Sequence, residues 1–165
     1  MTALTDDDLF YARVVAAFVD ALEDTGREVA PDAAARTLDV GAAGGAGRVL
    51  VVVRPAARTV TLYAPHLQRV PSDERARVAE LVVRATSDLF VAALELDTRT
   101  GVVSACHALA LGEVEPPDEA LVGLVVAALE EVETTIARYA PAVAAVLDGA
   151  EPAAAAADVL RADLA

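Results

Sequence analysis

The chain of 165 residues is poor in the residue types on which most metal and redox chemistry depends. It holds one cysteine, Cys106, and two histidines, His66 and His107. A single cysteine excludes an intrachain disulfide, a Cys-x-x-Cys redox pair and a zinc site built from several thiolates, and it agrees with a reducing compartment. Nothing in the spacing of carboxylates around the histidines indicates a metal site. The sequence therefore predicts neither a metal nor another cofactor.

Long apolar runs are also missing, although hydrophobic residues make up 56% of the chain and the mean hydropathy is +0.45. The longest suspicious run, Ala120–Leu129, has ten residues. A helix that crosses a bilayer needs about 20. The first residues, with Asp6, Asp7 and Asp8, lack the basic start and apolar stretch of a secretory signal. We therefore expect a cytoplasmic protein without a membrane partner.

Lysine is absent, and the chain has 13 basic and 26 acidic residues, which gives a net charge of −13. A charge of this sign repels the phosphate backbone of nucleic acids and anionic lipid headgroups. Nucleic acid is therefore an unexpected partner for this acidic chain.

Amphipathic patterns predict three helices. Thr5 can cap the first, whose first turn holds three aspartates and which ends at Thr25-Gly26. Pro71 and Ser72 open the second. The buried face of this helix should consist of Val78, Leu81, Val82 and Ala85. On the exposed face, ion pairs are expected among Arg77, Glu80, Arg84 and Asp88. The third runs from Pro117 to Gly149, with a kink expected at Pro141.

Between the helices, β-branched and alternating segments predict five strands: 35–40, 48–54, 59–63, 90–97 and 102–110. Short links join the first three, which favours an antiparallel meander after a loop around Pro31. Because residues 49–53 are all apolar, we expect the second strand to be more fully buried than the first. The last two strands meet in a hairpin at Asp97–Gly101. We predict one α+β domain over 1–149, followed by an alanine-rich tail, 150–165, that is either a docked helix or a frayed end.

Two motifs invite a catalytic interpretation and do not support it. Gly41–Gly47 is rich in glycine, but a strand follows it, so that it lacks the helix N-terminus of a nucleotide site and is best interpreted as a hairpin link. Cys106 and His107 are adjacent on a strand, where neighbouring side chains point to opposite faces and cannot share a proton. We expect no catalytic residue and no enzyme activity.

Interaction candidates lie on the third helix. Val122 and Val126 flank its core stripe and form either extra core or half of a homodimer seam. Acidic residues surround the helix start, where they cap the helix or offer a docking surface for a basic partner. The predicted partner-binding residues are Val122, Val126, Glu119 and Glu130. A separate possibility is an anion site formed by Arg48, Arg54 and Arg58.

In this order of elements the chain resembles the YbjN-like family of candidate sensory transduction regulators, which share the type III secretion chaperone-like fold. The resemblance spans roughly Leu9–Gly149 and is carried by the segments Ser87-Asp88, Leu94–Val103, Ala108–Leu111 before Pro116-Pro117, and Ile136–Val143. It implies a compact domain with a five-stranded antiparallel sheet backed by helices, a homodimer, and no catalysis.

The resemblance leads to one main hypothesis, a non-enzymatic protein-binding or chaperone-like regulator whose partner is a protein or peptide client. The alternative is a sensor domain for a small ligand, either an anion or a metabolite. A hydrolase ranks third, because it would require a cleft with converging carboxylates that nothing in the sequence indicates.

Overall fold

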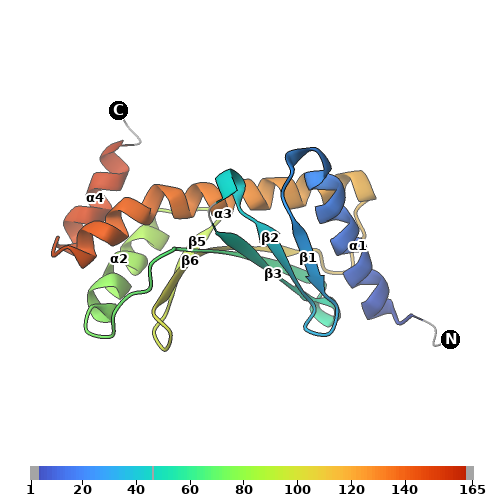
Figure 1. Ribbon diagram of the computed structural model, residues 1–165, viewed down its shortest axis with the longest axis horizontal. Coiled ribbons are helices and arrows are strands. Elements are labelled where there is room, and N and C mark those ends of the chain that lie inside the picture. The colour runs from blue at the N-terminus through green and yellow to red at the C-terminus, as the bar shows by residue number, and fades with distance from the viewer. Residues whose placement is uncertain (1–3, 46, 163–165) are drawn as a thin grey trace. The chain divides into compact units, whose positions relative to one another are not determined.

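The structure is a computed structural model, and it describes residues 4–45 and 47–162. In that part of the chain, six strands form one sheet in the order β1-β2-β3-β4-β6-β5 (Figure 1). The β1–β2, β2–β3, β3–β4 and β5–β6 pairs are antiparallel. The predicted α+β class, with a helix, an antiparallel meander, a helix, a hairpin and a long helix, is confirmed.

The chain divides into two compact units. The first is formed by Met1–Tyr63 and His107–Glu130, and the second by Ala64–Cys106 and Glu131–Ala165. Three elements, β4, β6 and α3, belong to both units because the chain passes from one unit to the other inside them. The predicted domain boundary at residue 149 stays a prediction.

In the first unit, α1 spans Asp6–Leu22 and begins as predicted. The Thr5 hydroxyl accepts from the Asp8 amide while the Asp8 carboxylate accepts from the Thr5 amide, which is a capping box. A 3-10 turn, Glu23–Thr25, follows, and Gly26 adopts the left-handed conformation that ends the segment. The buried face of the helix consists of Phe10, Tyr11, Val14, Ala17, Phe18 and Leu22.

The prediction of a loop around Pro31 is wrong, because these residues form a strand, β1 (Val29–Asp32). The sheet therefore has one strand more than the sequence indicated. Proline is tolerated there because β1 is an edge strand. The next strand, β2 (Thr37–Gly41), starts later than expected, after a turn in which the Asp32 carboxylate accepts from the Ala34 and Ala35 amides.

The strand β3 (Arg48–Arg54) is not more fully buried than β2, against the prediction, because both strands are buried at alternate positions only. Val49, Val51 and Val53 are buried, whereas Leu50 is 42% exposed and Val52 is half-buried. One face of this antiparallel segment therefore lacks full cover, although its residues are all apolar. Gly41–Gly47 joins β2 to β3 as a hairpin link, as predicted, with Ala46 outside the described residues. A 3-10 turn, Pro55–Ala57, leads to β4 (Thr59–Pro65).

In the second unit, α2 spans Arg75–Ser87 and starts later than predicted, so that Asp73 and Glu74 precede its first turn. The predicted buried stripe, Val78, Leu81, Val82 and Ala85, is confirmed. The strand β5 is only Ala93–Asp97, because the residues before it form a bend, and β6 is Val102–Ala110. Gly101, in the turn between them, has φ of +77° and lies against the Val70 carbonyl.

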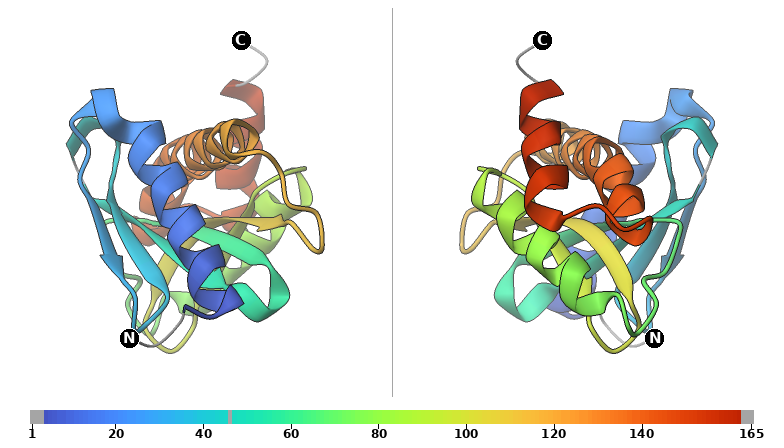
Figure 2. Two further views of the ribbon diagram at one scale, coloured as in Figure 1. Left: turned by 90° about the vertical axis from the view of Figure 1, so that its right-hand side faces the viewer. Right: turned by 90° about the vertical axis from the view of Figure 1, so that its left-hand side faces the viewer.

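The long helix α3 is Asp118–Leu147 and continues through Pro141. Its apolar stripe is predicted at positions 121, 124, 125, 128, 129, 132, 136, 139, 143 and 147. Most of these positions are buried, but Leu124 is 38% exposed. The predicted alanine-rich tail contains a further helix, α4 (Pro152–Ala162), which packs beside α2 (Figure 2). No helix in residues 4–45 and 47–162 has both the length and the apolar character needed to span a membrane.

Candidate interaction surfaces

The predicted partner-binding residues all lie on the part of α3 that belongs to the first unit. Val122 and Val126 are half-buried, whereas Glu119 and Glu130 are exposed. Val122 lines a small cleft of about 60 Å³ together with Arg13 on α1. Val122 therefore packs partly within its own unit, and the partner-binding role of the four residues stays a prediction.

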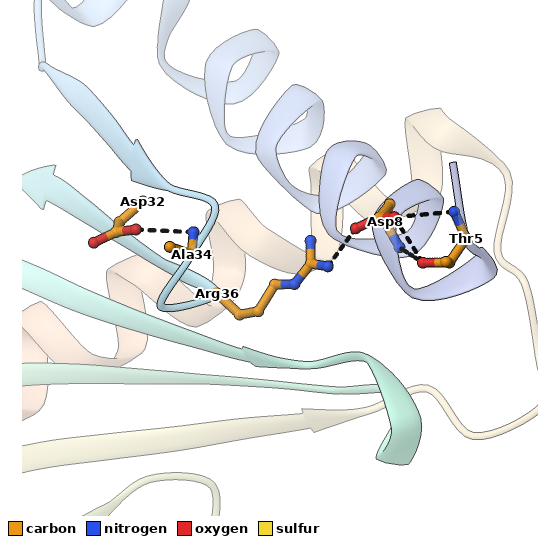
Figure 3. A network of polar contacts seen from close by, with 5 residues as sticks. All are labelled: Thr5, Asp8, Asp32, Ala34 and Arg36. Carbon is orange, nitrogen blue, oxygen red and sulfur yellow. Dashed lines mark hydrogen bonds and ion pairs between the residues drawn. The ribbon is translucent and has the colours of Figure 1, made fainter. Parts of the chain in front are cut away.

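The start of α1 carries a network of charged side chains (Figure 3). Arg36, in the turn before β2, pairs with the Asp8 carboxylate, and its guanidinium lies 5.2 Å from the centre of the Tyr11 ring. The hydrogen bonds from Arg36 and from the Thr5 hydroxyl hold the pKa of Asp8 well below its usual range. The Arg36–Asp8 pair connects α1 to the β1–β2 turn, and the two opposite charges neutralise each other.

Two of the three arginines considered for anion binding are already paired with carboxylates. Arg58 contacts Asp6 at 2.7 Å and Glu115 at 3.5 Å, and Arg48 contacts Glu28 at 3.0 Å and Asp39 at 3.2 Å. Arg54 is exposed on β3. A hollow of about 450 Å³ next to Arg58 is also lined by Glu113, which would repel an anion. The structure therefore gives this anion site no support.

Cys106 and His107 are consecutive residues of β6, which places their side chains on opposite faces. The Cys106 thiol donates to the Glu95 carboxylate at 3.2 Å. Burial and this carboxylate raise the pKa of Cys106 to about 12, so that the thiol stays protonated at neutral pH and is a poor nucleophile. No group of three His, Cys, Asp or Glu side chains able to hold a metal ion occurs in the part of the chain that the structure describes.

Each edge strand of the sheet has a feature that hinders the addition of a further strand, and neither feature was predicted from the sequence. On β1, the Gly41 amide donates to the Glu28 carbonyl, and the alternation of the ladder then turns the Pro31 nitrogen outward, where it has no hydrogen to donate. On β5, the Thr86 hydroxyl accepts from the Leu94 amide and donates to the Leu94 carbonyl, both at 3.0 Å. Proline and covered edges are known ways to prevent strand addition.

Among residues 4–45 and 47–162, the most exposed large apolar side chain is in the bend between α2 and β5. Phe90 is 101% exposed, and its neighbour Val91 is 62% exposed. The predicted strand over residues 90–97 is wrong at Phe90, because the end of α2 determines the conformation there. The amides of Asp88 and Leu89 fold back onto the carbonyls of Ala85 and Thr86, so the chain is still turning at residue 90. We call Asp88–Val91 the Phe90 loop.

Comparison with known proteins gives one structural likeness to report. No family profile matches the chain, and no curated protein matches it. Among solved structures, it is similar to the crystal structure of YbjN from E. coli, with 18% sequence identity and a TM-score of 0.49. The similarity covers 74% of this chain and 87% of YbjN. The match concerns the same group of proteins as the resemblance noted in the sequence.

Proposed function

We propose that this protein is a non-enzymatic regulatory domain that binds another protein through the Phe90 loop. The observation that carries the proposal is the full exposure of the Phe90 ring, beside the exposed Val91. An aromatic side chain in water contributes nothing to folding, whereas in the pocket of a partner it becomes a typical binding anchor. The regulatory part of the proposal comes from the family resemblance noted in the sequence.

The charge around the Phe90 loop defines the partner further. Asp88 and Glu95 are exposed near the ends of this segment, and the chain as a whole carries a net charge of −13. A partner that accepts the ring would therefore have an apolar pocket with basic residues at its rim, because complementary charge accelerates association and excludes acidic competitors. Because the negative charge repels phosphate backbones and anionic lipid headgroups, the proposal includes no nucleic-acid or membrane partner. The proposed location is the cytoplasm.

The way in which the client binds also follows from the sheet edges. Strand addition needs a row of unpaired backbone groups, and Pro31 and Thr86 interrupt that row on β1 and β5. This favours docking of side chains over pairing of backbones. The homodimer expected from the resemblance belongs to the same proposal, with Val122 and Val126 as its seam.

The experiment compares native pull-downs, read by mass spectrometry, for the wild type and two variants. Phe90→Ser removes the proposed anchor. Leu67→Ser is the matched control, because Leu67 is 76% exposed in another segment of the same unit. The wild type and Leu67→Ser should recover the same specific protein, and Phe90→Ser should lose it. Recovery of that protein by Phe90→Ser, or of no specific protein by the wild type, would contradict the proposal.

The mass in solution, measured by sedimentation on the same samples, tests the homodimer separately. A dimer that Val122→Asp converts to a monomer, while Phe90→Ser leaves it intact, would support the seam. A wild-type monomer at all concentrations would rule it out.

A further inference from the structure

The Phe90 loop is closed at its base by a single hydroxyl group. Thr86, in the last turn of α2, accepts from the Leu94 amide and donates to the Leu94 carbonyl of β5, both at 3.0 Å. These two residues flank the segment 87–93, which contains the whole Phe90 loop. One side chain therefore joins the two ends of the loop, in addition to its effect at the edge of the sheet.

Thr86 and the next residue, Ser87, use their hydroxyl groups differently. A serine or threonine within a helix commonly donates to a carbonyl three or four residues earlier in the same helix. The Ser87 hydroxyl does this, because it donates to the Val83 carbonyl at 2.9 Å. Thr86 instead bonds to a residue of another element. The chain thus contains two adjacent hydroxyl groups, and only that of Thr86 closes the loop.

The backbone is also fixed on both sides of the exposed residues. On one side, the amides of Asp88 and Leu89 donate to carbonyls of the last turn of α2. On the other side, Ala92 lies two residues after Phe90 and is buried. The two exposed side chains of the loop are therefore carried on a short segment with both ends anchored.

An anchored loop explains how the Phe90 ring stays in water. Burial of a large apolar side chain is favourable, so a loose loop would let the ring fold onto apolar surface of its own unit. Val83 on α2 is 68% exposed and offers such a surface. The two bonds of Thr86 oppose this collapse. A ring that is already held outward also loses less conformational entropy when a partner binds it.

We infer that Thr86 is a positioning residue for partner binding, because its hydroxyl holds the Phe90 loop in the conformation that the partner's pocket accepts. The inference rests on the proposed function, since it concerns how the same loop binds. It adds that the partner recognises a preformed loop, and that Thr86 acts through this loop. If the loop adopts the accepted conformation for a smaller fraction of the time, the apparent dissociation constant rises in inverse proportion to that fraction.

The first test uses the free protein and needs no partner. NMR measures the hydrogen exchange of the Leu94 amide and the backbone order parameter of Phe90. Thr86→Val removes the hydroxyl but keeps the shape of the side chain, Thr86→Ser keeps the hydroxyl, and Ser87→Ala removes the other hydroxyl. Only Thr86→Val should accelerate the exchange, about tenfold, and lower the order parameter from about 0.85 to below about 0.6. A loop that stays ordered in Thr86→Val would overturn the inference.

The second test uses the partner protein that the wild type recovers in the native pull-down, after purification, with rate constants measured by surface plasmon resonance. Thr86→Val leaves fewer competent molecules, so it should lower the association rate constant about tenfold and leave the dissociation rate constant unchanged. Loss of a direct contact acts mainly on dissociation, as Phe90→Leu should show. Thr86→Ser should restore the wild-type association rate. If Thr86→Val does not fold, Thr86→Ala replaces it, because alanine is the best helix former.

The outcomes separate this inference from the proposed function. If Phe90→Ser abolishes binding but Thr86→Val associates at the wild-type rate, the positioning role is refuted and the proposed function stands. If Thr86→Val changes only the dissociation rate, Thr86 is a direct contact, which also refutes the positioning role. If Phe90→Ser retains the partner, or if the wild type recovers none, the proposed function fails and the positioning role fails with it.

Discussion

Two groups of arginines, one in each unit, differ in the groups that they hold. In the first unit Arg36, Arg48 and Arg58 pair with carboxylates on neighbouring elements. In the second unit, Arg75 donates to the carbonyls of Val70 and Thr98, and Arg77, besides its pair with Glu74, donates to those of Val146 and Ala150. A partly exposed ion pair contributes little to stability, but a carbonyl that loses its donor can cost more. The turns that Arg75 and Arg77 hold should therefore depend on those arginines more strongly than the first unit depends on its three paired arginines.

The largest effect should come from a pair of glycine variants, one in each unit. Gly101→Ala, in the second unit, puts a Cβ atom into the Val70 carbonyl at a positive φ, whereas Gly112→Ala, in the first, meets no atom within 4 Å at φ of +59°. We expect Gly101→Ala to lower the free energy of unfolding by about 3 kcal/mol or more, and Gly112→Ala by about 1–2 kcal/mol. Urea unfolding measures both, and equal losses would contradict the assigned close contact.

The next effect tests the arginine comparison directly. Arg77→Met keeps the aliphatic stem but removes the donors to Val146 and Ala150 together with the pair to Glu74, and it should cost about 1.5–3 kcal/mol. Arg48→Met, which breaks exposed pairs with Glu28 and Asp39 and a donation to the Asp39 carbonyl, should cost much less, because these contacts are in water. Urea unfolding measures both variants. If Arg48→Met were the more damaging change, the proposed difference between these two arginines would be refuted.

A smaller effect is expected at the edge of β5. Thr86→Val keeps the shape of the side chain but leaves the Leu94 amide and carbonyl without the hydroxyl, at a cost of about 1–2 kcal/mol. Ser87→Ala is the control, because the Ser87 hydroxyl only donates to the Val83 carbonyl within α2. Thr86→Val should also aggregate faster at equal fractions folded, as light scattering would show. If Thr86→Val were as stable and as soluble as Ser87→Ala, the proposed protection of the β5 edge by Thr86 would be refuted.

Acid should act on the first unit through Asp8. The native pKa of Asp8 lies below the ordinary value of 3.8, so its contribution to stability is full above that value and is lost as the pH falls below it. The stability difference between the wild type and Asp8→Asn should therefore shrink from pH 5 towards pH 2, as thermal unfolding at each pH would report. A difference independent of pH would exclude the charged pair with Arg36 as its source.

Alkali should act on the second unit through Cys106, with the smallest effect. Its native pKa is raised from 9.0 to about 12, so the unfolded chain loses this proton first and stability falls as the pH rises through that interval. Cys106→Ala should reduce the slope of stability against pH between 9 and 12. In the native protein, alkylation by iodoacetamide at pH 8 should be much slower than in urea. Equal rates would mean that the thiol is not protected.

The start of α1 and the buried face of α2 could be predicted from the sequence, because each local pattern is typical of a single structure. Thr5 followed by three aspartates can only favour a helix start, and the stripe on α2 has the period of a half-buried helix. The sequence was insufficient where tertiary partners decide. Pro31 is compatible with a loop or with an edge strand, and only its place in the sheet distinguishes the two.

The candidate sites were less predictable than the fold. Arg77 has the spacing of a surface ladder, and its carbonyl partners are about seventy residues away in the sequence, so no local pattern reveals them. Phe90 has strand propensity, but the end of α2 determines its conformation. The bonds of Thr86 to Leu94 depend on how β5 packs beside α2, which no local pattern predicts.

The chain enters the second unit after Tyr63, returns to the first after Cys106 and leaves it again after Glu130. During synthesis, the first unit therefore cannot be completed until residue 130 has left the ribosome, when much of the second unit is already outside as well. Neither half of the gene encodes a unit that folds by itself, so a shuffled or truncated gene that stops between these crossing points would produce two incomplete cores.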